Sequence, residues 1–245
     1  MPNFKLTLCY DGSRYKGWQK QGNTDNTIQG KLEAALGGIL ARPVEISGSG
    51  RTDAGAHARM QVASFRASTD MPASELLTRL RSVLPEDIGV VSLTEAAPRF
   101  HARLSCVGKT YVYRVWNSEL PNVFERRYIY TVCDKLDLAA MQKAAEHFIG
   151  SHDFAAFCSL KNPKRSTVRH IDELRIERLG CELRFTVSGD GFLYNMVRII
   201  VGTLLSVGKG ELSPDAIPEI LASRDRQCAG PTVPAKGLCL EKVRY

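Results

Sequence analysis

An aspartate among small residues is the strongest candidate for chemistry in this sequence. Residues 47–57 read SGSGRTDAGAH, so that Asp53 follows Arg51 by two positions and is surrounded by glycine, serine and alanine. Small neighbours allow another backbone or a flat ring to approach a carboxylate closely. A carboxylate held in this way can act as a nucleophile or accept a proton. The alternative is a surface turn in which Arg51 and Asp53 form a weak local ion pair.

A cation in an apolar segment is the second candidate. Arg198 lies in residues 191–201, GFLYNMVRIIV, and its neighbours from Met196 to Val201 are all apolar. An arginine in such a place is rarely buried without an acidic partner, and Asp53 is a candidate for that partner. The alternative is an arginine whose side chain extends along the apolar surface to solvent.

Two tyrosines and a lysine alternate in residues 109–114, KTYVYR. On a strand, Lys109, Tyr111 and Tyr113 would point to the same face. A surface of this kind can stack on bases and contact phosphates in RNA recognition. Tyrosines are also common on strands that pack into a core, and for this stretch alone core packing is the better interpretation.

The remaining glycine and cysteine patterns do not form cofactor or metal motifs. Residues 48–50, GSG, begin like a dinucleotide-binding fingerprint, but Asp53 occupies the position of the third glycine. Residues 108–110, GKT, resemble the end of a phosphate-binding loop, but Arg103 stands where that loop begins with glycine. The seven cysteines are scattered without a CxxC pair, and the HxE…PCxxC pattern of zinc deaminases is absent. We therefore expect no cofactor and no metal.

Composition bounds the class of protein and its partners. The 245 residues are 44% hydrophobic and 24% charged, which is typical of a soluble globular protein. No apolar run approaches the roughly 20 residues that span a bilayer, and residues 1–10 do not resemble a signal peptide. With an odd set of scattered cysteines, this predicts a cytoplasmic protein without a membrane partner. The 33 Lys and Arg against 26 Asp and Glu give a net charge of +7, which favours a polyanionic partner such as nucleic acid.

Alternating strands and helices must position these candidates. Apolar periodicity predicts helices at residues 27–40, capped by Asn26, at 74–84, at 138–149, capped by Asp137, at 193–207 and at 214–222. It predicts strands at residues 4–10, 44–47, 61–65, 88–94, 109–116, 171–178, 181–188 and 237–243, with a hairpin turn at 179–180. This order indicates an α+β fold with an antiparallel sheet covered on one side by helices. We expect a division into residues 1–104, which carry the aspartate loop, and 105–245, which carry the tyrosine strand and the arginine helix.

Eight motifs, in the same order along nearly the whole chain, closely resemble those of the bacterial tRNA pseudouridine synthase A family. They are YDGSRYKGWQ at 10–19, TIQG at 27–30, GRTDAG at 50–55, FHAR at 100–103, KTYVY at 109–113, HDFAAF at 152–157, GFLYNMVR at 191–198 and GLCL at 237–240. Each motif is modest alone, but the set of eight is specific. Two departures, Ala56 and His170, do not touch the expected chemistry.

The resemblance implies a fold, a reaction and a partner. The implied fold is that of pseudouridine synthases, a mixed and mostly antiparallel sheet flanked by helices, in two similar halves with the active-site cleft between them. The implied reaction isomerises uridine to pseudouridine at positions 38, 39 and 40 of the tRNA anticodon stem-loop, without a cofactor. The implied assembly is a homodimer with tRNA crossing both subunits.

The resemblance also implies roles for four residues. Asp53 is the expected nucleophile, and Arg198 is expected to form an ion pair with it. Tyr111 is expected to lie against the target base and could move a proton, while Arg51 is expected to help flip the base out of the stem. The residues do not decide whether the carboxylate acts at the sugar C1′, at the base C6 or through a glycal intermediate.

Further residues are expected to contact the tRNA. Beside Tyr111, the predicted substrate contacts are Leu238, Arg14, Lys16, Lys161, Lys164, Arg165 and Arg169. The basic members of this set are expected to hold phosphates, because phosphate contacts position a protein on nucleic acid.

Two other functions remain open at this point. A non-catalytic tRNA-binding module or chaperone would share the basic charge and the tyrosines, but it would have no need for Asp53 in a small-residue loop. A carboxylate-based nucleoside hydrolase would release free uracil, and it would normally need a second acid or a metal.

Overall fold

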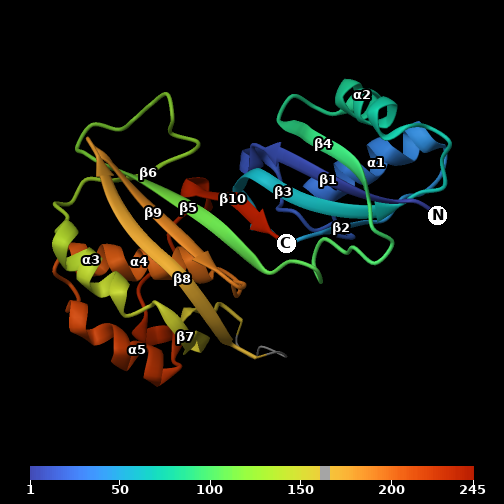
Figure 1. Ribbon diagram of the computed structural model, residues 1–245. Coiled ribbons are helices and arrows are strands. Elements are labelled where there is room, and N and C mark those ends of the chain that lie inside the picture. The colour runs from blue at the N-terminus through green and yellow to red at the C-terminus, as the bar shows by residue number, and fades with distance from the viewer. Residues whose placement is uncertain (161–165) are drawn as a thin grey trace. The chain divides into compact units, whose positions relative to one another are not determined.

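The computed structural model describes residues 1–160 and 166–245, which form two compact units (Figure 1). The first unit comprises Met1–Val107 together with Cys239–Tyr245, and the second comprises Gly108–Leu238. Both contain strands and helices, and the strand pairs are mixed but mostly antiparallel, which confirms the α+β class. Within the described residues, no helix has the length and apolar character needed to cross a membrane.

The first unit is built on a sheet in the order β4, β1, β3, β10, with the short β2 beside β3. Its strands are β1 (Asn3–Tyr10), β2 (Ile46–Gly48), β3 (His57–Arg66), β4 (Ile88–Ala96) and β10 (Leu238–Arg244), and its helices are α1 (Ile28–Leu40) and α2 (Ala73–Val83). β1 lies antiparallel to both β3 and β4, whereas β10 runs parallel to β3 and pairs Cys239 with His57. The end of the chain thus completes the sheet that its beginning starts (Figure 1).

The second unit has the strand order β5, β9, β8, β7, with β6 parallel to β5. Its strands are β5 (Gly108–Asn117), β6 (Tyr130–Val132), β7 (Gly150–Asp153), β8 (Val168–Leu179) and β9 (Glu182–Gly189), and its helices are α3 (Leu138–Glu146), α4 (Met196–Gly208) and α5 (Ile217–Ser223). Short 3-10 turns occur in the first unit at Gly12–Arg14, and in the second unit at Ala155–Phe157, Pro214–Ala216, Arg226–Cys228 and Ala235–Gly237. α3 contacts both α4 and β8, so the helices cover this sheet as a layer (Figure 1).

The cores follow the apolar periodicity of the sequence. In the first unit Phe4, Leu6 and Leu8 of β1 and Leu32 and Leu36 of α1 are almost fully buried. Each such side chain contributes about 1.5–3 kcal/mol relative to its exposed state, so these faces fix how the elements pack. The predicted hairpin is also present, because β8 and β9 pair antiparallel around Gly180, which has a φ of +61°.

Some predicted boundaries are wrong for identifiable reasons. Thr27 rather than Asn26 caps α1, since its side-chain oxygen accepts a hydrogen bond from the Gly30 amide at 3.1 Å. Asn26 instead donates to the carbonyl oxygen of Arg14. Asp137 caps α3 as predicted. The helix predicted from residue 193 begins at Met196, because Asn195 has a left-handed backbone with a φ of +63°.

Candidate active site

Asp53 lies in the short loop between β2 and β3 of the first unit. Asp53 is partly exposed and Arg51 is exposed, whereas Thr52 between them is buried. The Asp53 carbonyl accepts a hydrogen bond from the Ala56 amide at 3.1 Å, which closes a turn directly after the carboxylate. The loop therefore presents both predicted site residues while its centre is anchored in the protein.

Thr52 anchors the loop through both its side chain and its backbone. Its hydroxyl lies 2.8 Å from the Tyr10 hydroxyl, a buried contact with the end of β1. Its carbonyl oxygen accepts a hydrogen bond from the Trp18 amide at 3.1 Å. The residue next to Asp53 is thereby held from two sides.

Gln61 of β3 connects the beginning of the loop to the same buried group. Its Oε1 accepts hydrogen bonds from the Ser49 hydroxyl at 2.6 Å and from the Val62 amide at 3.1 Å. Its Nε2 donates to the Gly50 carbonyl at 3.1 Å and lies 3.5 Å from the Tyr10 hydroxyl. Buried polar groups are stable when they are hydrogen-bonded in this way.

The segment before α1 holds the other side of the loop. The Gly55 amide donates to the Tyr15 carbonyl at 3.3 Å. Gly17 has a φ of +89°, and a Cβ there would lie 2.8 Å from the Thr52 carbonyl oxygen. A Cβ on Gly12 would lie only 1.8 Å from the Ala56 carbonyl oxygen. Two glycines are therefore required for this close approach of backbone to backbone.

The tyrosines beneath and beside the loop stay protonated at neutral pH. Burial raises the pKa of the Tyr10 hydroxyl far above its ordinary value, although the hydrogen bonds to Thr52 and Gln61 oppose the change. Burial, together with a 2.5 Å hydrogen bond to Asp87, raises the pKa of Tyr15 to about 12. Both hydroxyls can therefore act as hydrogen-bond donors over the physiological range.

Tyr111 and Tyr113 of β5 have different surroundings in the second unit. The ring of Tyr111 is largely buried and meets Phe192 edge-on, with centroids 5.2 Å apart. Tyr113 is completely buried and donates its hydroxyl proton to the Pro234 carbonyl at 2.7 Å. Tyr113 thus packs in the core, which is the interpretation that the sequence of this stretch favours, and the role of Tyr111 at the target base stays a prediction.

Arg198 lies in the first turn of α4, and its side chain is oriented by local partners. Its Nε donates to the Val233 carbonyl at 2.7 Å, and its Nη1 donates to Oδ1 of Asn195 at 2.8 Å. Asn195 in turn donates from Nδ2 to the Ser159 hydroxyl at 2.9 Å. The guanidinium is therefore partly buried with a defined direction, and its expected ion pair with Asp53 stays a prediction.

The remaining predicted contacts are dispersed. Lys16 is exposed. Arg14 forms a 2.6 Å ion pair with Asp87, and its side chain stays 66% exposed. Arg14 also lines an open pocket of about 460 Å³ together with Asn26 and Lys31. Arg169 donates to the carbonyl oxygens of Ser166 and Val168, and Leu238 is buried at the start of β10. The expected contacts Lys161, Lys164 and Arg165 lie outside the described residues.

Sequence reasoning missed the buried supports of both predicted site residues. For the aspartate loop these are Tyr10, Thr52 and Gln61, and for Arg198 the support is Asn195. A glutamine beside Val62 and Ala63 on a strand is a usable signal, because a fully buried amide must find partners inside the protein. In residues 1–160 and 166–245 no group of three or more metal-ligating side chains comes together.

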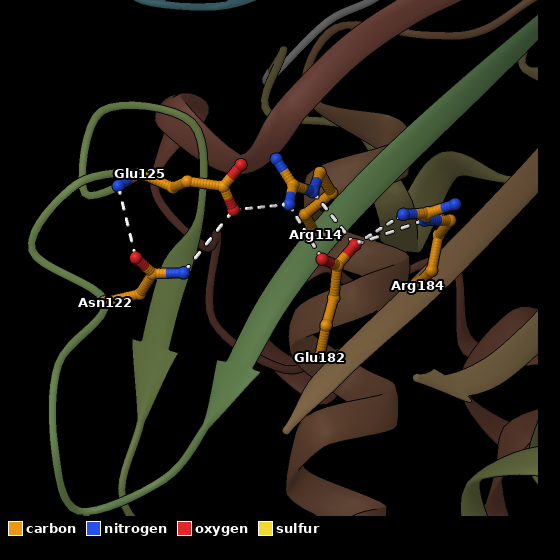
Figure 2. Close-up of polar contacts among 5 residues, drawn as sticks. All are labelled: Arg114, Asn122, Glu125, Glu182 and Arg184. Carbon is orange, nitrogen blue, oxygen red and sulfur yellow. Dashed lines mark hydrogen bonds and ion pairs between the residues drawn. The ribbon is translucent and has the colours of Figure 1, made fainter. Parts of the chain in front are cut away.

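A charged cluster on β5 and β9 belongs to the framework of the second unit. Arg114 binds Glu182 with two hydrogen bonds, at 2.9 and 2.7 Å, and also contacts Glu125 at 2.7 Å (Figure 2). Glu182 accepts two further hydrogen bonds from Arg184, at 3.1 and 3.0 Å. The hydrogen bonds from Arg114 hold the pKa of Glu182 below its ordinary value. The cluster links two strands to the segment that contains Asn122 and Glu125 (Figure 2).

Comparisons with known proteins agree on one family. A family model described as tRNA pseudouridine synthase matches residues 8–104 and 144–245. The chain is 47% identical over 245 residues to tRNA pseudouridine synthase A 2 of Clostridium perfringens and 44% identical over 245 residues to the protein of that name in Bacillus cereus. It is 46% identical over 246 residues to tRNA pseudouridine synthase A of Moorella thermoacetica. Each of these alignments covers 100% of both chains.

Proposed function

The chain belongs to the tRNA pseudouridine synthase A family and isomerises uridine to pseudouridine in tRNA, and from this premise we propose that Asp53 is its nucleophile. One observation carries the proposal. The backbone on both sides of Asp53 is held by hydrogen bonds, at Thr52 to Trp18 and at Gly55 to Tyr15, while the residue itself stays partly exposed. A reactive group needs this combination of a fixed position and access to substrate.

The chemistry requires a carboxylate but no redox partner. The bond between N1 of uracil and C1′ of the ribose breaks, the uracil turns, and a bond between C5 and C1′ forms. The proton on C5 is lost and a proton is gained at N1, so nothing is added or oxidised. Asp53 can attack C1′, attack C6 of the base, or remove a sugar proton on the way to a glycal, and all three routes begin from the ionised carboxylate.

We assign supporting roles to three further residues. Arg198 would form an ion pair with Asp53. Its fixed hydrogen bonds to Asn195 and Val233 support this role, since they orient the guanidinium without neutralising it. Tyr111 would lie against the uracil while it turns and could move the C5 proton. Arg51, which is exposed beside Asp53, would help to hold the base outside the stem.

We propose the anticodon stem-loop as the target, with uridines 38, 39 and 40 as substrates. The net charge of +7 supports binding to the tRNA backbone. Two of the proposed phosphate contacts, Arg14 and Lys31, line one open pocket. The other proposed phosphate contacts are Lys16, Arg169, Lys161, Lys164 and Arg165, and Leu238 is a proposed substrate contact. We further propose that the enzyme acts as a homodimer in the cytoplasm, where its tRNA substrate is found.

Mapping pseudouridines in bulk tRNA tests the proposed substrate. Bulk tRNA from cells that lack this protein is incubated with the purified enzyme. Sequencing then locates each pseudouridine in the tRNA, and the reaction mixture is assayed for free uracil. We expect pseudouridine to appear at positions 38, 39 and 40 and no uracil to be released. New pseudouridine elsewhere in the tRNA, or release of uracil, would contradict the proposal.

A further inference from the structure

We propose that the buried side chains of Tyr10, Ser49, Thr52 and Gln61, called here the loop-support group, are positioning residues for the isomerisation. They set the backbone from Gly50 to Asp53 and thereby the direction of the carboxylate. This inference rests on the proposed role of Asp53, and it concerns four side chains that do not themselves touch the reacting atoms.

The group joins the loop to the two strands beside it. Tyr10 is the last residue of β1, Gln61 lies within β3, and Ser49 and Thr52 belong to the loop. All four residues are buried, with exposed fractions of 5%, 0%, 1% and 6% for Tyr10, Gln61, Ser49 and Thr52. Because β1 and β3 pair antiparallel with each other, the group fixes the loop to the sheet of this unit.

The hydrogen-bond partners of Gln61 fix the orientation of its side-chain amide. The Val62 amide can only donate, so the atom 3.1 Å from it must be the amide oxygen of Gln61. The other end is then the NH₂ group, which donates to the Gly50 carbonyl at 3.1 Å and points to the Tyr10 hydroxyl at 3.5 Å. The Tyr10 hydroxyl also lies 2.8 Å from the Thr52 hydroxyl, and either of the two can donate the proton.

The group adds a side-chain anchor at Thr52 to the backbone contact that already holds this residue beside Asp53. Thr52 is fixed through its carbonyl by Trp18 and through its hydroxyl by Tyr10. Without the hydroxyl contact the peptide between Thr52 and Asp53 keeps one anchor and can rotate about it. A displacement of about 1 Å at a reacting group lowers the rate on the order of 100-fold, so a small rotation is enough to impair turnover.

Two pairs of variants test this role. Tyr10→Phe removes only the hydroxyl, and Tyr245→Phe is its matched control, because the Tyr245 hydroxyl also donates a hydrogen bond within the first unit, to the Ala102 carbonyl at 2.8 Å. Thr52→Val replaces the hydroxyl by a methyl group of similar size, whereas Thr52→Ser retains it. The assay measures tritium release from tRNA labelled at uridine C5, with kcat and KM separated, and thermal unfolding in parallel.

We expect Tyr10→Phe and Thr52→Val to lower kcat on the order of 10- to 100-fold with KM nearly unchanged. Thr52→Ser should restore most of kcat, and Tyr245→Phe should lose stability without losing kcat. If Tyr10→Phe does not fold, the two Thr52 variants decide alone. A kcat of folded Thr52→Val equal to that of Thr52→Ser would overturn the proposal.

Asp53→Asn is assayed in the same series to separate the two proposals. If it turns over tRNA at the normal rate, the role of Asp53 itself is wrong. If it is inactive while Thr52→Val remains fully active, Asp53 keeps its role and only the loop-support group loses the one proposed here.

Discussion

The guanidinium of Arg198 donates a hydrogen bond to Oδ1 of Asn195 at 2.8 Å, and Asn195 is the left-handed residue directly before α4. One asparagine thus both ends the preceding loop and orients the arginine that we propose as partner of the proposed nucleophile Asp53. Asparagine suits both tasks, because it tolerates a positive φ and carries an acceptor on a short side chain.

Replacing Asn195 by glycine separates the backbone role from the side-chain role. Glycine accepts the φ of +63° but leaves Arg198 and Ser159 without this partner. We expect a loss of about 1 kcal/mol in unfolding free energy and about a 10-fold lower kcat, measured by urea unfolding and tritium release. Asn117→Ala is the control, since it removes three side-chain hydrogen bonds in the second unit, to Val132, Asp134 and Arg178. Equal kcat values for the two variants would argue against an orienting role.

Gly12 should tolerate no side chain. A Cβ there would lie 1.8 Å from the Ala56 carbonyl oxygen, on the segment that follows Asp53. We expect Gly12→Ala to destabilise the protein by on the order of 3 kcal/mol and to lower activity, because the backbone must move apart. Gly38→Ala in α1 is the control, since a Cβ there meets no atom within 4 Å, and it should stabilise the helix by about 0.5–1 kcal/mol. Calorimetric melting of both variants checks this, and a normal melting temperature for Gly12→Ala would refute the close approach.

Glu182 should make stability depend on pH in the acid range. The hydrogen bonds from Arg114 hold the folded pKa of Glu182 below its unfolded value of about 4.3, so its contribution is complete above that pH and disappears as pH falls through the folded pKa. We expect Glu182→Gln to cost about 1–3 kcal/mol at pH 7 and less near pH 3, measured by urea unfolding at both values. Glu177→Gln, at an exposed pair with Arg175, should cost less than about 0.5 kcal/mol. The same cost for Glu182→Gln at both pH values would contradict this assignment.

The sequence predicts the fold class and most elements because their apolar periodicity is strong. Leu32 and Leu36 place one face of α1, and Gly180 places the turn of the β8–β9 hairpin. The helix before Arg198 is too long in the prediction, because apolar side chains at 193 and 196 continue the helical pattern while the backbone of Asn195 interrupts it. β6 and β7 were not predicted, since three or four residues carry too little periodicity to reveal a strand.

Partners distant in sequence are the second limit. The pairing of β10 with β3 places Cys239 beside His57. The expected division between residues 104 and 105 assigns these two residues to different halves of the chain. Local composition also does not distinguish the surroundings of Tyr111 from those of Tyr113. Both tyrosines lie on one strand, but different groups pack around them. For the same reason the sequence identifies Asp53 but not Tyr10 and Gln61, which reach its loop from β1 and β3.

The central claim is that the carboxylate of Asp53 carries the isomerisation, and Asp53→Asn tests it most directly. Asparagine keeps the shape of the side chain but cannot act as the nucleophile or base. Asp137→Asn is the matched control, because asparagine caps a helix about as well as aspartate does and Asp137 caps α3. Tritium release from tRNA labelled at uridine C5 is measured together with tRNA binding. We predict that Asp53→Asn binds tRNA normally and releases no tritium, while Asp137→Asn behaves like the wild type. Tritium release by Asp53→Asn at a rate near that of the wild type would contradict the account.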